Sequence, residues 1–183
     1  MEIRIGTKQI LTLLKILSWI IFLGLCVEAG GIIFNSAYVL YKPVAATYFW
    51  NGANLSDLYA HDKGQFIILT ILMSIAAVMK ALIFYLIVKL FYDKKFSIAK
   101  PFNPDVTGIV FKISYCCLGA GIFSLWGARH ASWLKSQGVQ VPNIQNLRID
   151  GGDVWLFMAV ALMVIGQVFK KGTELQTESD LTV

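Results

Sequence analysis

Residues 66–92 read FIILTILMSIAAVMKALIFYLIVKLFY, an apolar run long enough to cross a bilayer as a helix. A spanning helix needs about 20 apolar residues, and this run is interrupted near its middle by one charged residue, Lys80. A charge at that depth costs about 2.5–3.5 kcal/mol on insertion scales, so an intramembrane lysine indicates a function or a partner. The run therefore predicts a membrane helix whose lysine faces other parts of the protein.

The whole sequence shares this apolar character. It is 57% hydrophobic and 15% charged, with a mean hydropathy of +0.66, whereas soluble domains are about half apolar and about a quarter charged. Apolar runs predict four spans, the last of them short, at residues 16–40, 66–92, 106–128 and 154–169. We therefore predict an all-α membrane protein, a four-transmembrane-helix bundle that occupies residues 1–183 as a single domain.

The basic residues predict the orientation of this bundle. Nine of them flank one side of the predicted spans, namely Arg4, Lys8, Lys15, Lys89, Lys94, Lys95, Lys100, Lys170 and Lys171. Five flank the other side, namely Lys42, Lys63, Arg129, Lys135 and Arg148. Because lysine and arginine are more frequent in cytoplasmic connections, both termini and the second connection are predicted to be cytoplasmic.

The first apolar run has a second interpretation, as a cleaved signal peptide. Val27-Glu28-Ala29 loosely resembles a cleavage site. The apolar character continues well past that point, and the run is longer than the core of a typical signal peptide. The uncleaved span is therefore the favoured interpretation.

Span two presents two different faces on a helical wheel, and they suggest a partner for Lys80. One face is bulky and suits lipid, whereas Lys80 shares the other with small residues that permit close helix contact. Span one has a matching stripe of small and polar residues, Gly24, Glu28, Gly31 and Asn35. Counted from the predicted inner boundaries, Glu28 lies about 20 Å and Lys80 about 18 Å into the bilayer, so we predict that they pair. Tyr115, on span three, is the alternative partner.

A Glu28–Lys80 pair has two interpretations. It can fix the register of the helices, as buried polar groups do in some proteins, or it can form the proton or ion site of a transporter. One lysine and one carboxylate are few polar groups for an ion pathway through the bilayer, which favours the first interpretation.

No nucleophile with an adjacent base, phosphate-binding loop or helical zinc motif occurs in the sequence. Asp57 and His61 supply too few ligands for a metal ion. We therefore expect no catalytic residues, no metal site and no cofactor.

The connections between the spans carry their own signals. KPFNPD, residues 100–105, predicts a helix that is capped by Asn103 and starts at Pro104. The long aromatic first outer connection, residues 41–65, contains SDLYAHDKG, which predicts a short surface helix capped at Ser56. In the second outer connection, residues 129–153, the stretch GVQVPNIQNLRIDGGD is compatible with a small hairpin that turns at PNIQN.

The tail, residues 170–183, changes abruptly from basic to acidic. Lys170 and Lys171 suit anionic lipid. The acidic residues either keep the tail in solution or present it to a partner protein, and the final Leu-Thr-Val is of the kind that some carboxylate-capturing domains accept. A plain soluble tail is the simpler explanation. The candidate partner-binding residues are Glu174, Glu178, Asp180 and Val183.

KPFNPDV, which opens span three, and KKGTELQTESDLTV, which closes the chain, carry a family resemblance. With four spans in this order, the chain resembles the YoaS-like family of uncharacterised small bacterial integral membrane proteins, a domain of unknown function. Lys80 and the NLSDLY stretch resemble a subgroup from Bacteroidetes-type bacteria. The resemblance implies a multi-pass protein of the bacterial cytoplasmic membrane with no known catalytic residues. It also implies a sensing or regulatory role, since some relatives are encoded beside a small helix-turn-helix regulator.

Two functional hypotheses follow. The first is a non-enzymatic sensor, regulator or accessory subunit that acts through partner proteins. The second is a small-solute or ion transporter that uses Glu28, Lys80 and Tyr115. The candidate partners are the lipid bilayer, a cytoplasmic or membrane protein and a second copy of the chain, and no nucleic acid is expected.

Overall fold

The computed structural model describes residues 7–92 and 103–181, and throughout these ranges the regular structure is helical. The elements are α1 (Thr7–Tyr41), the short 3-10 helix η1 (Pro43–Tyr48), α2 (Ser56–His61), α3 (Lys63–Tyr92), α4 (Pro104–Ser136) and α5 (Gly152–Leu181). Four of them, α1, α3, α4 and α5, are long and apolar enough to cross a membrane. The predicted all-α membrane fold with four spans is therefore confirmed.

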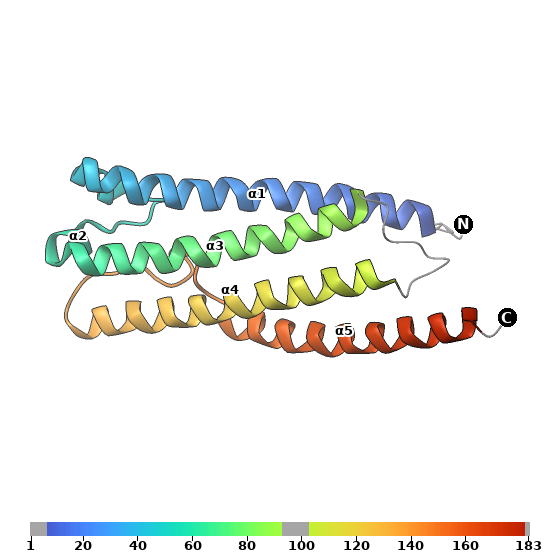
Figure 1. The fold of residues 1–183 in the computed structure, drawn as a ribbon. Coiled ribbons are helices and arrows are strands. Elements are labelled where there is room, and N and C mark those ends of the chain that lie inside the picture. Colours follow the sequence, from blue (N-terminus) through green and yellow to red (C-terminus); the bar gives the residue numbers. More distant parts are fainter. Residues whose placement is uncertain (1–6, 93–102, 182–183) are drawn as a thin grey trace, which may run out of the picture.

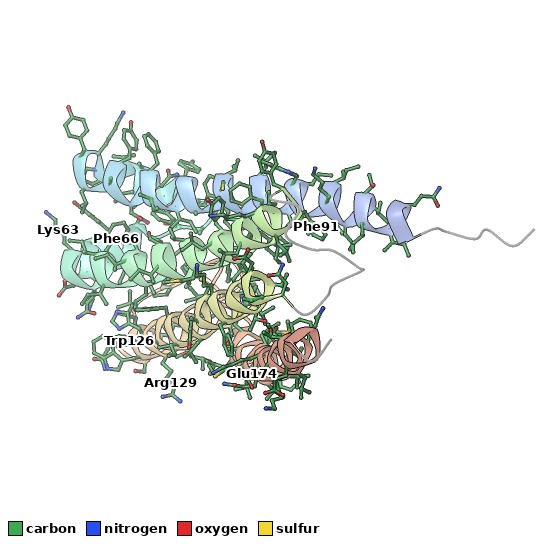
Figure 2. The ribbon with its side chains drawn as sticks, turned by 45° about the vertical axis from the view of Figure 1, so that its right-hand side comes forward. Lys63, Phe66, Phe91, Trp126, Arg129 and Glu174 are labelled. Carbon is green, nitrogen blue, oxygen red and sulfur yellow. The ribbon has the colours of Figure 1, made fainter. Side chains whose placement is uncertain are left out.

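The four long helices lie side by side in chain order (Figure 1). α1 packs against α3, α3 against α4 and α4 against α5, so α1 and α5 form the two edges of the bundle. α1 begins and α5 ends at the same end of the molecule, which we call the terminal end (Figure 1). The opposite end, where residues 42–62 and 137–151 connect the helices, is called the loop end. Side chains along one side of α1 face no other helix (Figure 2).

The helices are longer than the apolar runs that predicted them. α1 starts at Thr7 rather than at residue 16, and α4 continues past residue 128 to Ser136. α5 does not end at residue 169, because the basic and acidic residues of the tail continue the same helix to Leu181. Hydropathy detects the part of a helix that suits lipid, and it does not detect a polar extension.

The start of α4 confirms its predicted cap. The Asn103 side chain accepts a hydrogen bond from the backbone N–H of Asp105 at 2.8 Å, and Pro104 is the first helical residue. The short helix expected in the first outer connection is present as α2, but its cap differs from the prediction. Asn54 Oδ1 accepts hydrogen bonds from both the backbone N–H and the hydroxyl of Ser56, at 2.9 and 2.7 Å.

The second outer connection contains turns and no strand between residues 137 and 151, so the hairpin interpretation is wrong. Its apolar side chains are buried against the helices instead of facing one another. Leu147 and Ile149 are fully buried, and Ile149 lies against Gly127 of α4. Burial against the helices therefore takes the place of strand pairing.

Both outer connections contribute to one hydrophobic core at the loop end. Phe66, which lies between α1 and α3 in Figure 2, is fully buried and contacts the rings of Phe49 and Tyr59. The two connections are also joined directly, because the backbone N–H of Gln140 donates a 2.7 Å hydrogen bond to Asp57. The loop end is thus a packed cap over the helix ends. Its core also contains Val39, Ala46, Leu55, Leu58, Leu69, Ala131, Leu134, Val139, Val141, Leu147 and Ile149.

α5 begins far from the end of α4. Gly152 lies so close to α4 that a Cβ atom there would be 2.7 Å from the Leu125 side chain. Leu125 precedes the last residue of α4, Ser136, by 11 residues, so α5 begins about 16 Å nearer the terminal end. Residues 137–151 therefore run down along the helices before α5 starts.

Close packing and one hydrogen bond hold α5 against α4. Gly121 and Gly166 allow contact with Leu156 and Phe111 respectively, as small residues do between membrane helices. The buried Ser114 hydroxyl donates a hydrogen bond across the interface to the carbonyl of Ala159 at 2.8 Å. This bond joins two helices, whereas most serine hydroxyls in membrane helices bond to their own backbone.

We predict that Ser114→Ala lowers the free energy of unfolding by about 0.6 kcal/mol and at most about 1.7 kcal/mol, the range for hydrogen bonds between membrane helices. The matched control is Ser132→Ala, since the exposed Ser132 hydroxyl bonds only to Ala128 of its own helix. Reversible unfolding in mixed micelles measures both values. Equal losses for the two variants would contradict a stabilising role of the interhelical bond.

Candidate functional site

Lys80 lies inside the protein, as its position on the helical wheel predicts. The residue is 8% exposed, and it occupies the face of α3 that is turned toward the neighbouring helices. A lysine in this position needs acceptors for its ammonium group, because an unpaired buried charge is very costly.

The acceptor of Lys80 is a backbone carbonyl and not a carboxylate. Its Nζ atom donates a hydrogen bond to the carbonyl oxygen of Arg148 at 2.9 Å. The same atom lies 5.9 Å from the centre of the Trp155 ring, near the start of α5, within range of a cation–π attraction. The second outer connection and α5 thus both contribute to holding one charge of α3.

Glu28 is bound by the side chain of the same arginine. Its Oε2 atom lies 3.7 Å from Arg148 Nε, and the Glu28 side chain is 19% exposed. The predicted direct Glu28–Lys80 ion pair is therefore replaced by a bridge, in which Arg148 contacts Lys80 through its carbonyl and Glu28 through its guanidinium group.

Glu28 and Lys80 lie at nearly the same height on α1 and α3. Phe22 lies beside Tyr85, which sets the register of α1 against α3 and places Glu28 and Lys80 within about one residue of the same height. Each charge nevertheless contacts Arg148, Lys80 through the carbonyl and Glu28 through the guanidinium group. Comparing heights alone does not reveal that the second outer connection supplies both contacts.

The backbone of Arg148 adopts a left-handed conformation, with φ of 59°. Such a φ is uncommon for a residue with a side chain and is maintained only where the surroundings enforce it. Here the buried neighbours Leu147 and Ile149 fix the chain on both sides, while the Arg148 side chain stays 43% exposed. The conformation directs the carbonyl to Lys80 and leaves the guanidinium group free to reach Glu28.

The charges of this cluster balance. Lys80 and Arg148 are cations, and Glu28 and Asp150 are the acidic groups that attract Lys80 electrostatically. We call Glu28, Lys80, Arg148, Asp150 and Trp155 the polar cluster. Sequence reasoning missed Arg148 and Trp155. The available signal was Leu147-Arg148-Ile149, two apolar residues around a charge within an otherwise polar connection.

Tyr115 does not join the polar cluster. It is 60% exposed on α4, and the contacts of Lys80 go to Arg148 and Trp155 instead. Exposure of this kind on a membrane helix is typical of a residue that faces lipid.

The predicted small and polar stripe of α1 is only partly a protein contact. Gly31 is covered by the indole ring of Trp50, which comes from the first outer connection, and a Cβ atom at Gly31 would overlap this ring. Asn35 bonds to the carbonyl of Gly31 within the same helix, at 2.7 Å. A Cβ atom added at Gly24 would meet nothing within 4 Å. The indole thus attaches the first outer connection to the edge helix.

The tail residues lie on the last turns of α5, at the terminal end. Glu174, labelled in Figure 2, forms an ion pair with Lys171 at 3.2 Å, and Glu178 is exposed. Asp180 belongs to the last turn of the helix, and Val183 lies outside the described residues. The described part of the tail is thus a helical extension.

A polar cavity of about 640 Å³ opens between the two outer connections, beside the hydrogen bond from Gln140 to Asp57. It is lined by Asn54, Ser56, Asp57, Ala60, Gln140, Val141 and Pro142. Across residues 7–92 and 103–181, no group of three or more histidine, cysteine or acidic side chains is arranged to hold a metal ion.

A family model described as "Protein of unknown function (DUF2975)" matches residues 50–183. The matched range contains Lys80, Arg148 and Trp155, whereas Glu28 precedes it. No curated protein and no solved structure matches the chain.

The bridge through Arg148 predicts which charge exchange succeeds. Glu28→Arg combined with Arg148→Glu should restore most of the stability that each single change loses, because the two side chains contact one another. Glu28→Lys combined with Lys80→Glu should not, because an ionised glutamate at position 80 has no hydrogen to donate to the Arg148 carbonyl. Unfolding free energies of the singles and doubles measure the coupling, expected at about 0.5–3 kcal/mol for the first pair. If only the Glu28→Lys with Lys80→Glu exchange recovered stability, the bridge through Arg148 would be wrong and the direct Glu28–Lys80 pair would be supported.

The contact between Trp50 and Gly31 generates a separate prediction. Gly31→Ala should destabilise the protein by about 1–3 kcal/mol, because the added methyl group displaces the indole from a packed position. Gly30→Ala is the control, since a Cβ atom there meets nothing within 4 Å and alanine favours the helix. Thermal unfolding of the two variants, side by side, gives the difference. A loss at Gly30 as large as that at Gly31 would show that the indole contact contributes nothing.

Proposed function

We propose a function for this chain, which belongs to the DUF2975 family of proteins of unknown function: it is a non-enzymatic membrane sensor, regulator or accessory subunit that acts through partner proteins. We place it in the bacterial cytoplasmic membrane, in the YoaS-like, Bacteroidetes-type subgroup to which its sequence is similar. The distribution of basic residues supports an orientation with the terminal end in the cytoplasm.

One observation carries the proposal: the second outer connection contacts two membrane helices through a single residue. Arg148 accepts a hydrogen bond from Lys80 on α3 and pairs with Glu28 on α1. A change in the cap that moves this residue changes the polar contacts of both helices at once. Coupling between two sites requires a physically connected element of this kind.

The packed cap at the loop end, formed by residues 42–62 and 137–151 over the helix ends, offers a surface on which a signal can act. Its polar cavity lies between the first and second outer connections, so an occupant would contact both. Asp57 already links the two connections through Gln140. Because Leu147 and Ile149 are packed in the same cap core, displacement of the second connection is transmitted to Arg148.

The terminal end offers a surface to which a partner protein can bind. α5 extends beyond its apolar segment as a helix that carries Glu174 and Glu178, and α1 begins at the same end (Figure 1). An exposed acidic helix is a surface that a basic partner recognises through complementary charge.

The competing hypothesis is a transporter that uses Glu28 and Lys80. Intramembrane charges favour it in general. In this chain, however, both charges already have contacts within the protein, Lys80 with a carbonyl and Glu28 with a guanidinium group. An ion on such a path would have to displace these contacts, which favours the partner hypothesis.

The experiment is crosslinked affinity purification of the full-length protein from native membranes, read by mass spectrometry. Four versions are compared: the unchanged chain, a chain lacking residues 172–183, Glu174→Gln with Glu178→Gln, and Lys80→Met. We expect a near-stoichiometric partner with the unchanged chain and with Lys80→Met. Removal of the tail should abolish its recovery, and the charge-neutral variant, which retains the helix, should reduce it.

Recovery of the chain alone, or of a partner that is unaffected by both tail variants, contradicts the proposal. In that case ion flux in proteoliposomes decides the alternative. Flux that Lys80→Met abolishes and Lys112→Met preserves would establish transport, since Lys112 is an exposed lysine of α4 outside the polar cluster.

A further inference from the structure

An apolar groove runs between α1 and α3 on the side that faces the bilayer. It has a volume of about 360 Å³ and is bordered by Phe22, Cys26 and Ala29 on α1 and by residues from Val78 to Tyr85 on α3. Its lining is apolar apart from the Tyr85 hydroxyl. The groove is thus a furrow at the level of the hydrocarbon layer, separate from the polar cluster and the cap.

The helix faces that line the groove each lead to a lysine at the terminal end. Lys15 precedes Phe22 by seven residues, and Lys89 follows Tyr85 by four, so each lysine lies on the same face of its helix as the groove residues. Both lysines are exposed. Within the described part of the chain, neither ammonium group has a hydrogen bond or an ion pair.

Part of the groove lies within one leaflet of a bilayer. With Lys15 taken as the boundary, the groove residues of α1 lie from about 10 Å at Phe22 to about 21 Å at Ala29. Half of the hydrocarbon layer is about 15 Å thick, so the groove crosses the bilayer midplane. A lipid with its headgroup between the two lysines would therefore place about the distal third of an acyl chain in the part of the groove nearest the terminal end.

We propose that this groove binds one anionic phospholipid, with an acyl chain between α1 and α3 and the headgroup phosphate held by Lys15 and Lys89. The two unpaired cations distinguish the site from the apolar stripe of α1 that contains Ile20 and Val27, whose exposed side chains do not line the groove. Charge complementarity therefore selects an anionic headgroup, and the groove fixes where one acyl chain of the lipid lies. The proposal does not depend on the partner function above.

Native mass spectrometry of the full-length protein tests it with two lipids that share the same chains, phosphatidylglycerol and phosphatidylcholine. We expect one phosphatidylglycerol to be retained in preference. Lys15→Gln with Lys89→Gln should remove that preference. The expected loss is about 30-fold in the affinity for phosphatidylglycerol relative to phosphatidylcholine, since each lysine near an anionic group contributes about 1 kcal/mol. Lys112→Gln, which removes an exposed lysine of α4 away from the groove, should leave it unchanged.

A second pair of variants tests the chain position. Cys26→Phe fills the groove and should lower the retention of both lipids, whereas Val27→Phe, which adds the same ring on a face 66% exposed to the bilayer, should not. If a variant fails to fold, a photoactivatable phosphatidylglycerol with its reactive group near the chain end is used on the unchanged protein. Crosslinks are then expected at the groove residues, namely Phe22, Cys26, Ala29, Val78, Ala81, Leu82 and Tyr85, and not at Val27.

Three results would overturn the proposal: equal retention of the two lipids, a loss with Lys112→Gln as large as that with the double variant, or crosslinks spread evenly over the stripe of Ile20 and Val27. Each would mean that the groove is covered by ordinary surrounding lipid only.

Discussion

An ammonium group held inside a membrane protein must have an acceptor, and the arrangement of the loop end follows from how Lys80 obtains one. The carbonyls within a helix are already bonded to its own backbone. The second outer connection supplies an acceptor from outside the helices, the carbonyl of Arg148. Non-helical backbone is tolerated at such a level only where protein surrounds it. Leu147 and Ile149 meet this condition, because both are buried on either side of the arginine.

Because residues 137–151 run back toward the terminal end, α5 starts lower in the bundle than the point where α4 ends. α5 begins beside Leu125, while α4 continues to Ser136. The outer parts of α1, α3 and α4 therefore extend past the start of α5, and the two outer connections cover them. The result is a packed cap whose hydrophobic core is continuous with the membrane bundle. Trp155 lies where these two regions meet, close to Lys80.

The features that the sequence predicted correctly depend on residues within a single helix. Apolar runs were sufficient for the four spans, KPFNPD for the cap at Asn103, and the wheel position for the burial of Lys80. The failures depend on contacts between distant segments. A direct Glu28–Lys80 pair was inferred from height alone, although Arg148 of the second outer connection supplies the contacts of both charges. The hairpin was inferred from the possible turn at PNIQN, although Ile149 is buried against Gly127 of α4 instead. The indole that covers Gly31 comes from another segment and leaves no periodic signal.

The position of Arg148 late in the chain has a consequence for biogenesis. Ribosomes synthesise proteins from the N-terminus, so Glu28 and Lys80 are made before Arg148. During that interval neither charge has the partner that it has in the finished protein. The half-made chain is thus the form with exposed intramembrane charges, and insertion of residues 137–151 is the event that completes it. A protease or chaperone that recognises unpaired charges in the bilayer would therefore distinguish unfinished copies from finished ones without contacting the cap.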